Sequence, residues 1–185
     1  TLKAMEIWTA GHSTHSLPEL VALLRGAGVE ALADVRAVPR SRRHPHFARE
    51  ALARELPARG LRYRHIKRLG GWRRAQPGSP NGGWDNDAFQ GYADYALTAE
   101  FRAGLDELTE LAREARTAVM CAEGVWWRCH RRLIADQLLV RGWRVVHIAP
   151  DGGQTEHELT SFAVVDGERI TYPPRQGRLI DPDER

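Results

Sequence analysis

Cysteine and lysine are both scarce in this chain of 185 residues, which holds two of each. Two cysteines are too few for a disulfide framework, so we expect a reducing, cytoplasmic setting. No stretch reaches the run of about 20 apolar residues that a membrane span needs, and the first residues lack the apolar run of a signal peptide. These absences argue against disulfide-rich and membrane proteins and favour a globular domain.

Arginine supplies nearly all of the positive charge, since lysine occurs only at Lys3 and Lys67. The guanidinium group binds phosphates and carboxylates through paired hydrogen bonds. A GC-rich genome would also enrich arginine, and the formal net charge is only +3. The positions of the arginines, rather than their number, must therefore indicate a ligand.

Apolar periodicity predicts strands that alternate with helices along the chain. The predicted strands cover 5–10, 30–35, 61–66, 117–122 and 143–149, and the predicted helices cover 17–26, 46–56, 86–97, 99–115 and 129–141. This alternation is typical of an α/β fold, here a Rossmann-like three-layer α/β/α sandwich with a mainly parallel sheet of about five strands.

The last part of the chain carries a hairpin signal, "FAVVDGERITY", with Asp166-Gly167 at the turn. We expect this hairpin to pack at one edge of the sheet. The sequence thus predicts a single α/β domain over 1–185, with the core in 1–150 and the C-terminal hairpin and tail in 151–185.

Polar side chains follow four of the predicted strands, at 11–16, 36–44, 67–71 and 121–132, and His147 lies near the end of the fifth strand. Ligands of such sheets bind outside the carboxyl ends of the strands. We therefore expect one crevice at this edge, to which these segments contribute.

The segments "GHST", "DVRAVPRSRRHPHF", "LGGWRR", "NGGWDNDAFQGYADY" and "CAEGVWWRCHR" resemble, in order, the successive signature blocks of the domain of unknown function 488 family. The resemblance extends from Ile7 to about Tyr172 and implies the family's fold and a shared site, but no established activity. The family's pattern of a cysteine and a glutamate after a strand, followed by Cys-His-Arg at a helix start, maps onto Cys121, Glu123, Cys129, His130 and Arg131. The Trp126-Trp127 pair is not part of that pattern.

The first candidate for phosphate binding is "GHST", with Gly11, His12 and Ser13 before a helix that Ser16 caps. Backbone N–H groups at a helix N-terminus favour anions. The alternative is a tight strand-to-helix turn that needs Gly11 only for its backbone.

The second candidate is "RAVPRSRRHPHF", where Arg36, Arg40 and Ser41 give the density of a phosphate-binding loop. The alternative is a solvated basic loop. Arg36 follows a buried strand directly, so its side chain should point into the crevice, and we expect Asp34 to form an ion pair with it.

The two cysteines differ in their predicted surroundings. Cys121 ends a buried strand and is interpreted as a small core residue. Cys129 should lie in the first turn of a helix between Arg128 and Arg131, where the helix dipole and the positive charges lower a thiol pKa. The C-x6-R spacing from Cys121 to Arg128 is one residue longer than that of cysteine phosphatases, which argues against their mechanism.

Glu123 is a candidate general acid/base held by Arg131, with Cys129 and His130 as further catalytic candidates. The alternative is a buried Glu123–Arg131 pair that only ties the fourth strand to the next helix. Zinc is another alternative, because cysteine, glutamate and histidine are all zinc ligands. No C-x2-C pair is present, so we predict no cofactor and no metal.

Trp72, Trp84 and Trp126 lie outside the predicted strands, and the first two belong to an irregular loop over 67–85. Tryptophans beside arginines can stack on nucleic-acid bases. The loop would then close over the site as a lid. The alternative is that these rings pack over sheet edges or in a homodimer interface.

We therefore predict an enzyme that acts on a phosphate-bearing, base-containing ligand, either a nucleotide or an exposed nucleic-acid base. Arg36, Arg40 and Arg131 would hold the phosphate, and Glu123 would transfer protons. One alternative is a non-catalytic nucleic-acid-binding module, and another is a small-molecule or metal-binding protein. A Glu123→Gln variant separates the first two, because a module would keep full function while an enzyme would lose turnover.

Overall fold

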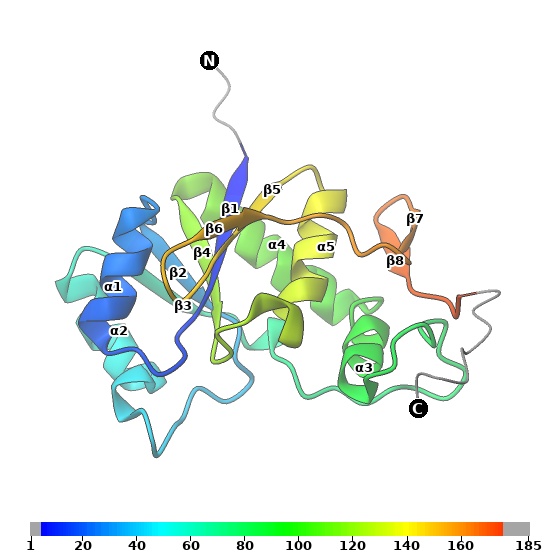
Figure 1. Ribbon diagram of the computed structural model, residues 1–185, viewed down its shortest axis with the longest axis horizontal. Coiled ribbons are helices and arrows are strands. Elements are labelled where there is room, and N and C mark those ends of the chain that lie inside the picture. The colour runs from blue at the N-terminus through cyan, green and yellow to red at the C-terminus, as the bar shows by residue number, and fades with distance from the viewer. Residues whose placement is uncertain (1–4, 176–185) are drawn as a thin grey trace.

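A computed structural model describes residues 5–175 and consists of a central sheet with helices on both faces (Figure 1). The sheet has six strands in the order β3-β2-β4-β1-β5-β6. The strands are β1 (Glu6–Gly11), β2 (Ala31–Asp34), β3 (Arg62–His65), β4 (Thr117–Cys121), β5 (Arg144–Ile148) and β6 (Gln154–Glu156). Every neighbouring pair is parallel except β5 and β6, which confirms the α/β fold and adds an antiparallel edge strand that the sequence did not predict.

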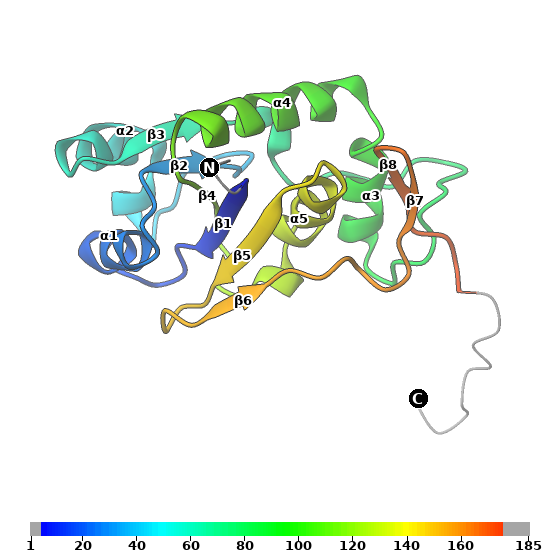
Figure 2. The ribbon, with the colours of Figure 1, turned by 90° about the horizontal axis from the view of Figure 1, so that it is seen from above.

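The helices form two layers, with α1 and α2 on one side of the sheet and α4 and α5 on the other (Figure 2). They are α1 (Leu17–Gly26), α2 (Arg49–Ala58), α3 (Asp87–Tyr95), α4 (Ala99–Glu114) and α5 (Arg131–Val140), with short 3-10 turns η1 (Pro45–Phe47), η2 (Lys67–Leu69) and η3 (Trp126–Arg128). Each layer buries its own apolar cluster against the sheet. Within residues 5–175, no helix combines the length and apolar character that crossing a membrane requires.

Two helices begin later than the sequence predicts, because each follows a 3-10 turn. Helix α2 starts at Arg49 after η1, and it continues through Pro57, the residue expected to end it. Pro57 lies in the last turn on the exposed side, where the Ala53 carbonyl that loses its N–H partner can be hydrated. Helix α5 starts at Arg131 rather than at Cys129, after η3.

The hairpin forms as predicted, from β7 (Val164–Asp166) and β8 (Arg169–Thr171), with Gly167 at a positive φ of 61° in the turn. Its expected place at a sheet edge is wrong. Ile170 and Tyr172 join the apolar cluster of α3, α4 and α5, while β6 occupies the sheet edge beside β5 (Figure 1).

The strand order creates a crevice between β1 and β4. These strands are neighbours in parallel register, with Gly11 opposite Cys121 at their carboxyl ends. The chain leaves β1 toward α1 on one face and leaves β4 toward α5 on the other. Because the two connections diverge, this is the topological switch point at which α/β sheets bind ligands.

Candidate functional site

A pocket of about 710 Å³ opens at this switch point, and we call it the strand-end pocket. It is formed by the segments that follow β1, β2 and β4, together with Gly71-Trp72 and one side of α3. Eleven of the residues that the sequence singled out line it: His12, Ser13, Arg36, Arg40, Ser41, Trp72, Cys121, Glu123, Arg128, Cys129 and His130. The geometry thus joins polar segments that are far apart in the sequence.

Gly11 shapes the pocket without lining it. The N–H groups of His12 and Ser13 donate to the carbonyls of Cys121 and Ala122, so they are not free to bind an anion. A Cβ atom on Gly11 would lie 1.8 Å from the Glu123 carbonyl oxygen, so only glycine permits this approach. The anion-binding interpretation of Gly11 is therefore wrong, and the tight-turn alternative is correct.

Arg36 lies under one side of the pocket in an ion pair with Asp34, as predicted. Its Nε and Nη2 donate to the two carboxylate oxygens at 2.9 and 2.7 Å, and Nη2 also donates to the Phe47 carbonyl. The Tyr63 hydroxyl donates to the same carboxylate at 2.6 Å. Asp34 is fully buried and Arg36 is nearly so, so the pair is a fixed part of the pocket floor.

Two neutral histidines line the pocket. Burial lowers the pKa of His12 to about 4, and its Nδ1 donates to the Ser13 carbonyl while Nε2 faces Arg36 at 3.4 Å. Burial also lowers the pKa of His130 to about 4, and its Nε2 donates to the Val35 carbonyl. Neither ring carries a charge near pH 7, so each leaves one unprotonated nitrogen.

The two cysteines meet at the base of the pocket, and we call them the thiol pair. Their sulfur atoms are 3.1 Å apart, and Arg131 Nε donates to both, at 3.0 Å to Cys121 and 3.2 Å to Cys129. Burial alone would raise the pKa of Cys129. The hydrogen bond from the Cys121 thiol and the charge of Arg131 outweigh burial and lower this pKa to about 6, while burial keeps the pKa of Cys121 well above its ordinary value.

Arg131 does not line the pocket and is fully buried. Its Nη1 donates to Thr9 Oγ1 at 3.1 Å and its Nη2 to the Glu123 carbonyl at 2.5 Å. The prediction that Arg131 binds phosphate is therefore wrong, since its side chain is fully buried and does not reach the pocket. The expected ion pair with the Glu123 carboxylate is also wrong, because Arg131 contacts the main chain of that residue.

Behind Arg131 runs a chain of buried hydrogen bonds, the buried relay. It links Arg131 to Thr9, Thr9 to His147 at 2.6 Å, His147 to His157 at 2.9 Å and His157 to Asp136 at 2.8 Å. Arginine only donates and a carboxylate only accepts. Arg131 therefore donates to Thr9 at one end of the relay, and His157 Nε2 donates to Asp136 at the other.

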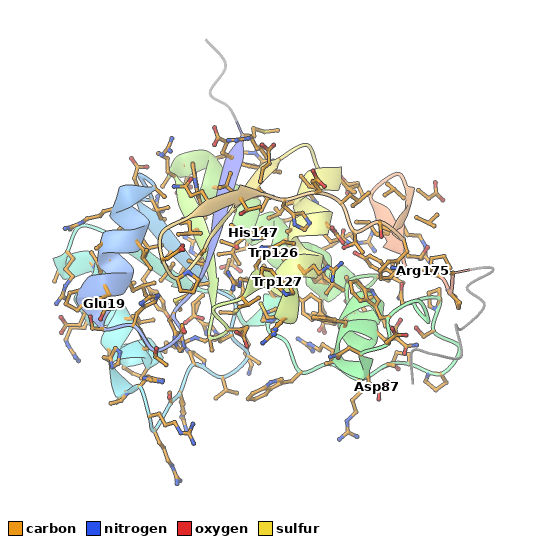
Figure 3. All side chains as sticks on the ribbon, in the orientation of Figure 1. Glu19, Asp87, Trp126, Trp127, His147 and Arg175 are labelled. Carbon is orange, nitrogen blue, oxygen red and sulfur yellow. The ribbon has the colours of Figure 1, made fainter. Side chains whose placement is uncertain are left out.

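Trp84 and Trp126 are not in the pocket, so their predicted roles in stacking on a ligand are wrong. Trp84 is buried among Phe89, Phe162 and Tyr172, with ring centroids about 5 Å away. Trp126 stacks on His147 at 4.1 Å over the buried relay (Figure 3). Both rings find apolar or aromatic partners inside the protein.

Trp72, in contrast, lies at the rim of the pocket with 85% of its surface exposed. Its φ of 61° falls in the left-handed region, which is costly for a bulky side chain. An exposed aromatic ring on a strained backbone fits a binding role better than a packing role.

The rim is basic and carries one carboxylate. Arg40, Arg43 and Arg128 line it, and none of them forms an ion pair with another residue of the described part. Glu123 is the one acidic residue among those lining the pocket, and its exposed carboxylate accepts from the Val125 N–H. The pocket can therefore neutralise an anion and transfer a proton at its mouth.

A metal interpretation gains no support from the donor set. Across residues 5–175, no three histidine, cysteine or acidic side chains are grouped closely enough to hold a metal ion. The thiol pair instead uses Arg131 as its positive partner.

Sequence reasoning missed the buried relay beyond His147. One signal was available, since Thr9 and Asp136 are polar residues within apolar segments, and buried polar groups need partners. It also missed Tyr92, a pocket residue whose hydroxyl donates to the Leu69 carbonyl and whose ring packs on His130. Tyr92 lies on the apolar side of its helix, and that position in the sequence does not indicate that it borders a pocket.

Comparison with protein families agrees with the resemblance noted in the sequence. Residues 16–138 match the family model described as "Domain of unknown function DUF488", and this range includes most of the residues that line the strand-end pocket. No curated protein and no solved structure matches the chain. Because the family model covers more than half of the sequence, the chain belongs to the DUF488 family.

Proposed function

We propose that this protein is an enzyme that uses Cys129 as a nucleophile on a phosphate-bearing, base-containing ligand, either a nucleotide or an exposed nucleic-acid base. The observation that carries the proposal is the position of the Cys129 sulfur. It lies in a pocket with a basic rim, and its pKa of about 6 makes it a thiolate at neutral pH. The thiolate is the nucleophilic form of cysteine.

The arginines support the phosphate part of the ligand. Arg40 and Arg43 come from the loop after β2, and Arg128 comes from η3, which follows β4. Guanidinium groups bind phosphate through paired hydrogen bonds, and these three lack carboxylate partners within the described residues. Arg36 contributes less, because Asp34 already holds it.

The aromatic residues support the base. Trp72 at the rim and Phe89 on α3 both line the pocket, and Trp72 offers an exposed ring face. Stacking of a base on an aromatic side chain contributes about 1–3 kcal/mol. The volume of about 710 Å³ lies within the range of small-molecule sites, so one nucleotide unit fits.

The chemistry needs only the chain's own groups, without a cofactor or metal. The Cys129 sulfur supplies the electron pair of a new bond to an electrophilic atom of the ligand, and the bond from that atom to its leaving group breaks, so that the leaving group departs with that electron pair and takes up a proton. Glu123 transfers the proton that the reaction requires, as the one acidic side chain lining the pocket. His130 is neutral, so its Nδ1 can accept a hydrogen bond from the ligand, whereas Nε2 of His12 already faces an N–H of Arg36.

Alkylation by iodoacetamide tests the site directly. We expect Cys129 to react with a midpoint near pH 6, and we expect a nucleoside monophosphate or a short single-stranded oligonucleotide to slow the reaction. Trp72→Ala should weaken this protection without changing the unprotected rate. If saturating nucleotide, oligonucleotide and inorganic phosphate all leave the rate unchanged, the proposed ligand class is wrong.

A non-catalytic nucleic-acid-binding module is the second candidate, because Arg40, Arg42 and Arg43 are exposed on one loop. Such a module should bind oligonucleotides with an affinity that falls steeply with salt. Arg42 separates the two candidates, since it does not line the pocket. Arg42→Ala should weaken binding by a module but leave nucleotide protection of Cys129 intact.

A further inference from the structure

We propose that Cys121 and Cys129 form a peroxide-sensitive dithiol, in which Cys129 is oxidised first and Cys121 then closes a reversible disulfide. The proposal rests on the geometry of the thiol pair and does not depend on the identity of the pocket's ligand. Only its consequence for turnover depends on the proposed function.

The geometry provides both partners of such a reaction. Both cysteines border the pocket, but Cys129 is partly exposed whereas Cys121 is only 3% exposed, so a small oxidant reaches Cys129 more readily. Their sulfur atoms lie 3.1 Å apart in a hydrogen bond. A redox-sensitive thiolate beside a second thiol is the arrangement that converts sulfenic acid to a disulfide.

Arg131 assigns the order of the two steps. Its guanidinium contacts both sulfurs, and its backbone N–H also donates to the Cys129 sulfur at 3.4 Å. These donors stabilise negative charge on Cys129, while the burial of Cys121 favours its protonated form. The charged groups around the pair come from α5, while His130, Tyr92 and Thr9 face it without charge.

The reaction balances with hydrogen peroxide as the oxidant. The Cys129 thiolate attacks one peroxide oxygen, the O–O bond breaks and hydroxide leaves, which gives a sulfenic acid. The Cys121 sulfur then attacks the Cys129 sulfur, the S–O bond breaks and the hydroxyl leaves as water with the Cys121 proton. The two thiols lose two hydrogen atoms in total, and peroxide is reduced to two molecules of water.

The disulfide should be easy to reduce. In the reduced state, the Cys129 thiolate offsets the positive charge of Arg131, which is fully buried. A disulfide carries no charge, so oxidation leaves this guanidinium with neutral direct partners, the Thr9 hydroxyl and the Glu123 carbonyl. Stabilisation of the reduced form makes a disulfide more oxidising, so a dithiol reagent should restore both thiols.

The experiment treats the reduced protein of 185 residues with hydrogen peroxide, unfolds it, blocks remaining thiols with N-ethylmaleimide and measures the intact mass. We expect a monomer that has lost two hydrogen atoms and carries no maleimide, and dithiothreitol should restore two labels per chain. Peptide mapping should place the crosslink between Cys121 and Cys129. Two maleimide labels after peroxide, or mainly intermolecular disulfides, would contradict the proposal.

Single variants test the order of the steps. Cys121→Ser should stop at a sulfenic acid on Cys129, which dimedone traps, whereas Cys129→Ser should leave Cys121 unoxidised. Equal dimedone labelling of wild type and Cys121→Ser would overturn the role of Cys121. If a variant fails to fold, the label count on the wild type still decides whether the disulfide forms. This mass measurement uses no nucleotide. A missing disulfide would therefore contradict only the dithiol proposal, and missing nucleotide protection would contradict only the proposed ligand class.

Discussion

Two buried arginines, Arg36 and Arg131, lie near the strand-end pocket, and their charges are offset in different ways. Arg36 is held by the Asp34 carboxylate through two hydrogen bonds. Arg131 has only sulfur atoms, a hydroxyl and a carbonyl as direct partners within the described residues. Both guanidinium groups are removed from water, so each depends on these partners for its stability.

The contact of Arg36 with Asp34 is fixed, whereas the anion beside Arg131 can be removed by chemical change of Cys129. The Asp34 carboxylate is fully buried and hydrogen-bonded to Arg36 and Tyr63, so the Arg36 region is part of the scaffold. The Cys129 thiolate can be protonated, alkylated or oxidised, and each of these changes removes the anion beside Arg131. The comparison therefore assigns stability to one arginine and reactivity to the other, and four variants test that division.

The largest expected effect is the loss of stability in Asp34→Asn. This variant leaves Arg36 buried without an anionic partner, which should lower the free energy of unfolding by about 3–5 kcal/mol. Urea unfolding measures the change. Glu114→Gln is the matched control, because it removes an exposed, solvent-screened ion pair with Arg62 and should cost far less. If the two variants lower the free energy of unfolding equally, the buried Asp34–Arg36 pair stabilises the protein no more than an exposed ion pair does.

Arg131→Met should change reactivity more than stability. Without the guanidinium, the pKa of Cys129 should rise toward its ordinary value, and the iodoacetamide rate near pH 7 should fall by about tenfold or more. Arg132→Met is the control, since Arg132 lies over the Trp84 ring rather than beside the sulfurs. A rate that stays at the wild-type value would show that Arg131 does not activate the thiol.

Cys129→Ser should remove a pH dependence of stability. The folded pKa of this thiol is about 6, below its ordinary value of 9.0, so ionisation stabilises the folded protein above the ordinary pKa. That contribution declines as the pH falls from about 9 to about 6. Urea midpoints of the wild type should therefore fall over this range relative to those of the variant. Parallel curves for the two proteins would contradict a thiolate in the folded state.

The smallest effect on stability should come from Glu123→Gln. The carboxylate is exposed and accepts one main-chain N–H, which a glutamine oxygen can also do, so the melting temperature should stay nearly unchanged. If Glu123 transfers protons, turnover of a nucleotide substrate should be lost while the nucleotide still protects Cys129. A large drop in melting temperature with full turnover would instead make Glu123 part of the scaffold.

The sequence predicted the fold class and most of the segments that form the pocket for a simple physical reason. Buried strands are runs of apolar residues, and polar groups such as Arg36 and Glu123 that follow them must emerge at the strand ends. The strand order was not predictable, because it depends on which apolar surfaces fit together. That order places β1 beside β4 and brings His12 and Ser13 against the segment after Cys121.

The errors concern side chains whose surroundings depend on the tertiary structure. Arg131 was expected at the pocket because it follows Cys129 closely. However, η3 precedes α5, which therefore starts at Arg131, and the Arg131 side chain points into the core. Trp84 and Trp126 lie outside the strands yet are covered by other parts of the fold. A loop position therefore does not establish that an aromatic ring is free to stack on a ligand.

The buried relay also constrains the order in which the contacts of the site can form while the chain is being synthesised. Chains emerge from the ribosome with their N-terminal part first. Arg131 and the thiol pair therefore emerge before His147, His157 and Tyr172, which supply the far end of the relay and two donors to Asp136. Until those residues arrive, the Asp136 carboxylate must stay hydrated, and α5 cannot complete its final packing. The contacts around Cys129 are therefore completed late, when nearly all of the described chain has been made.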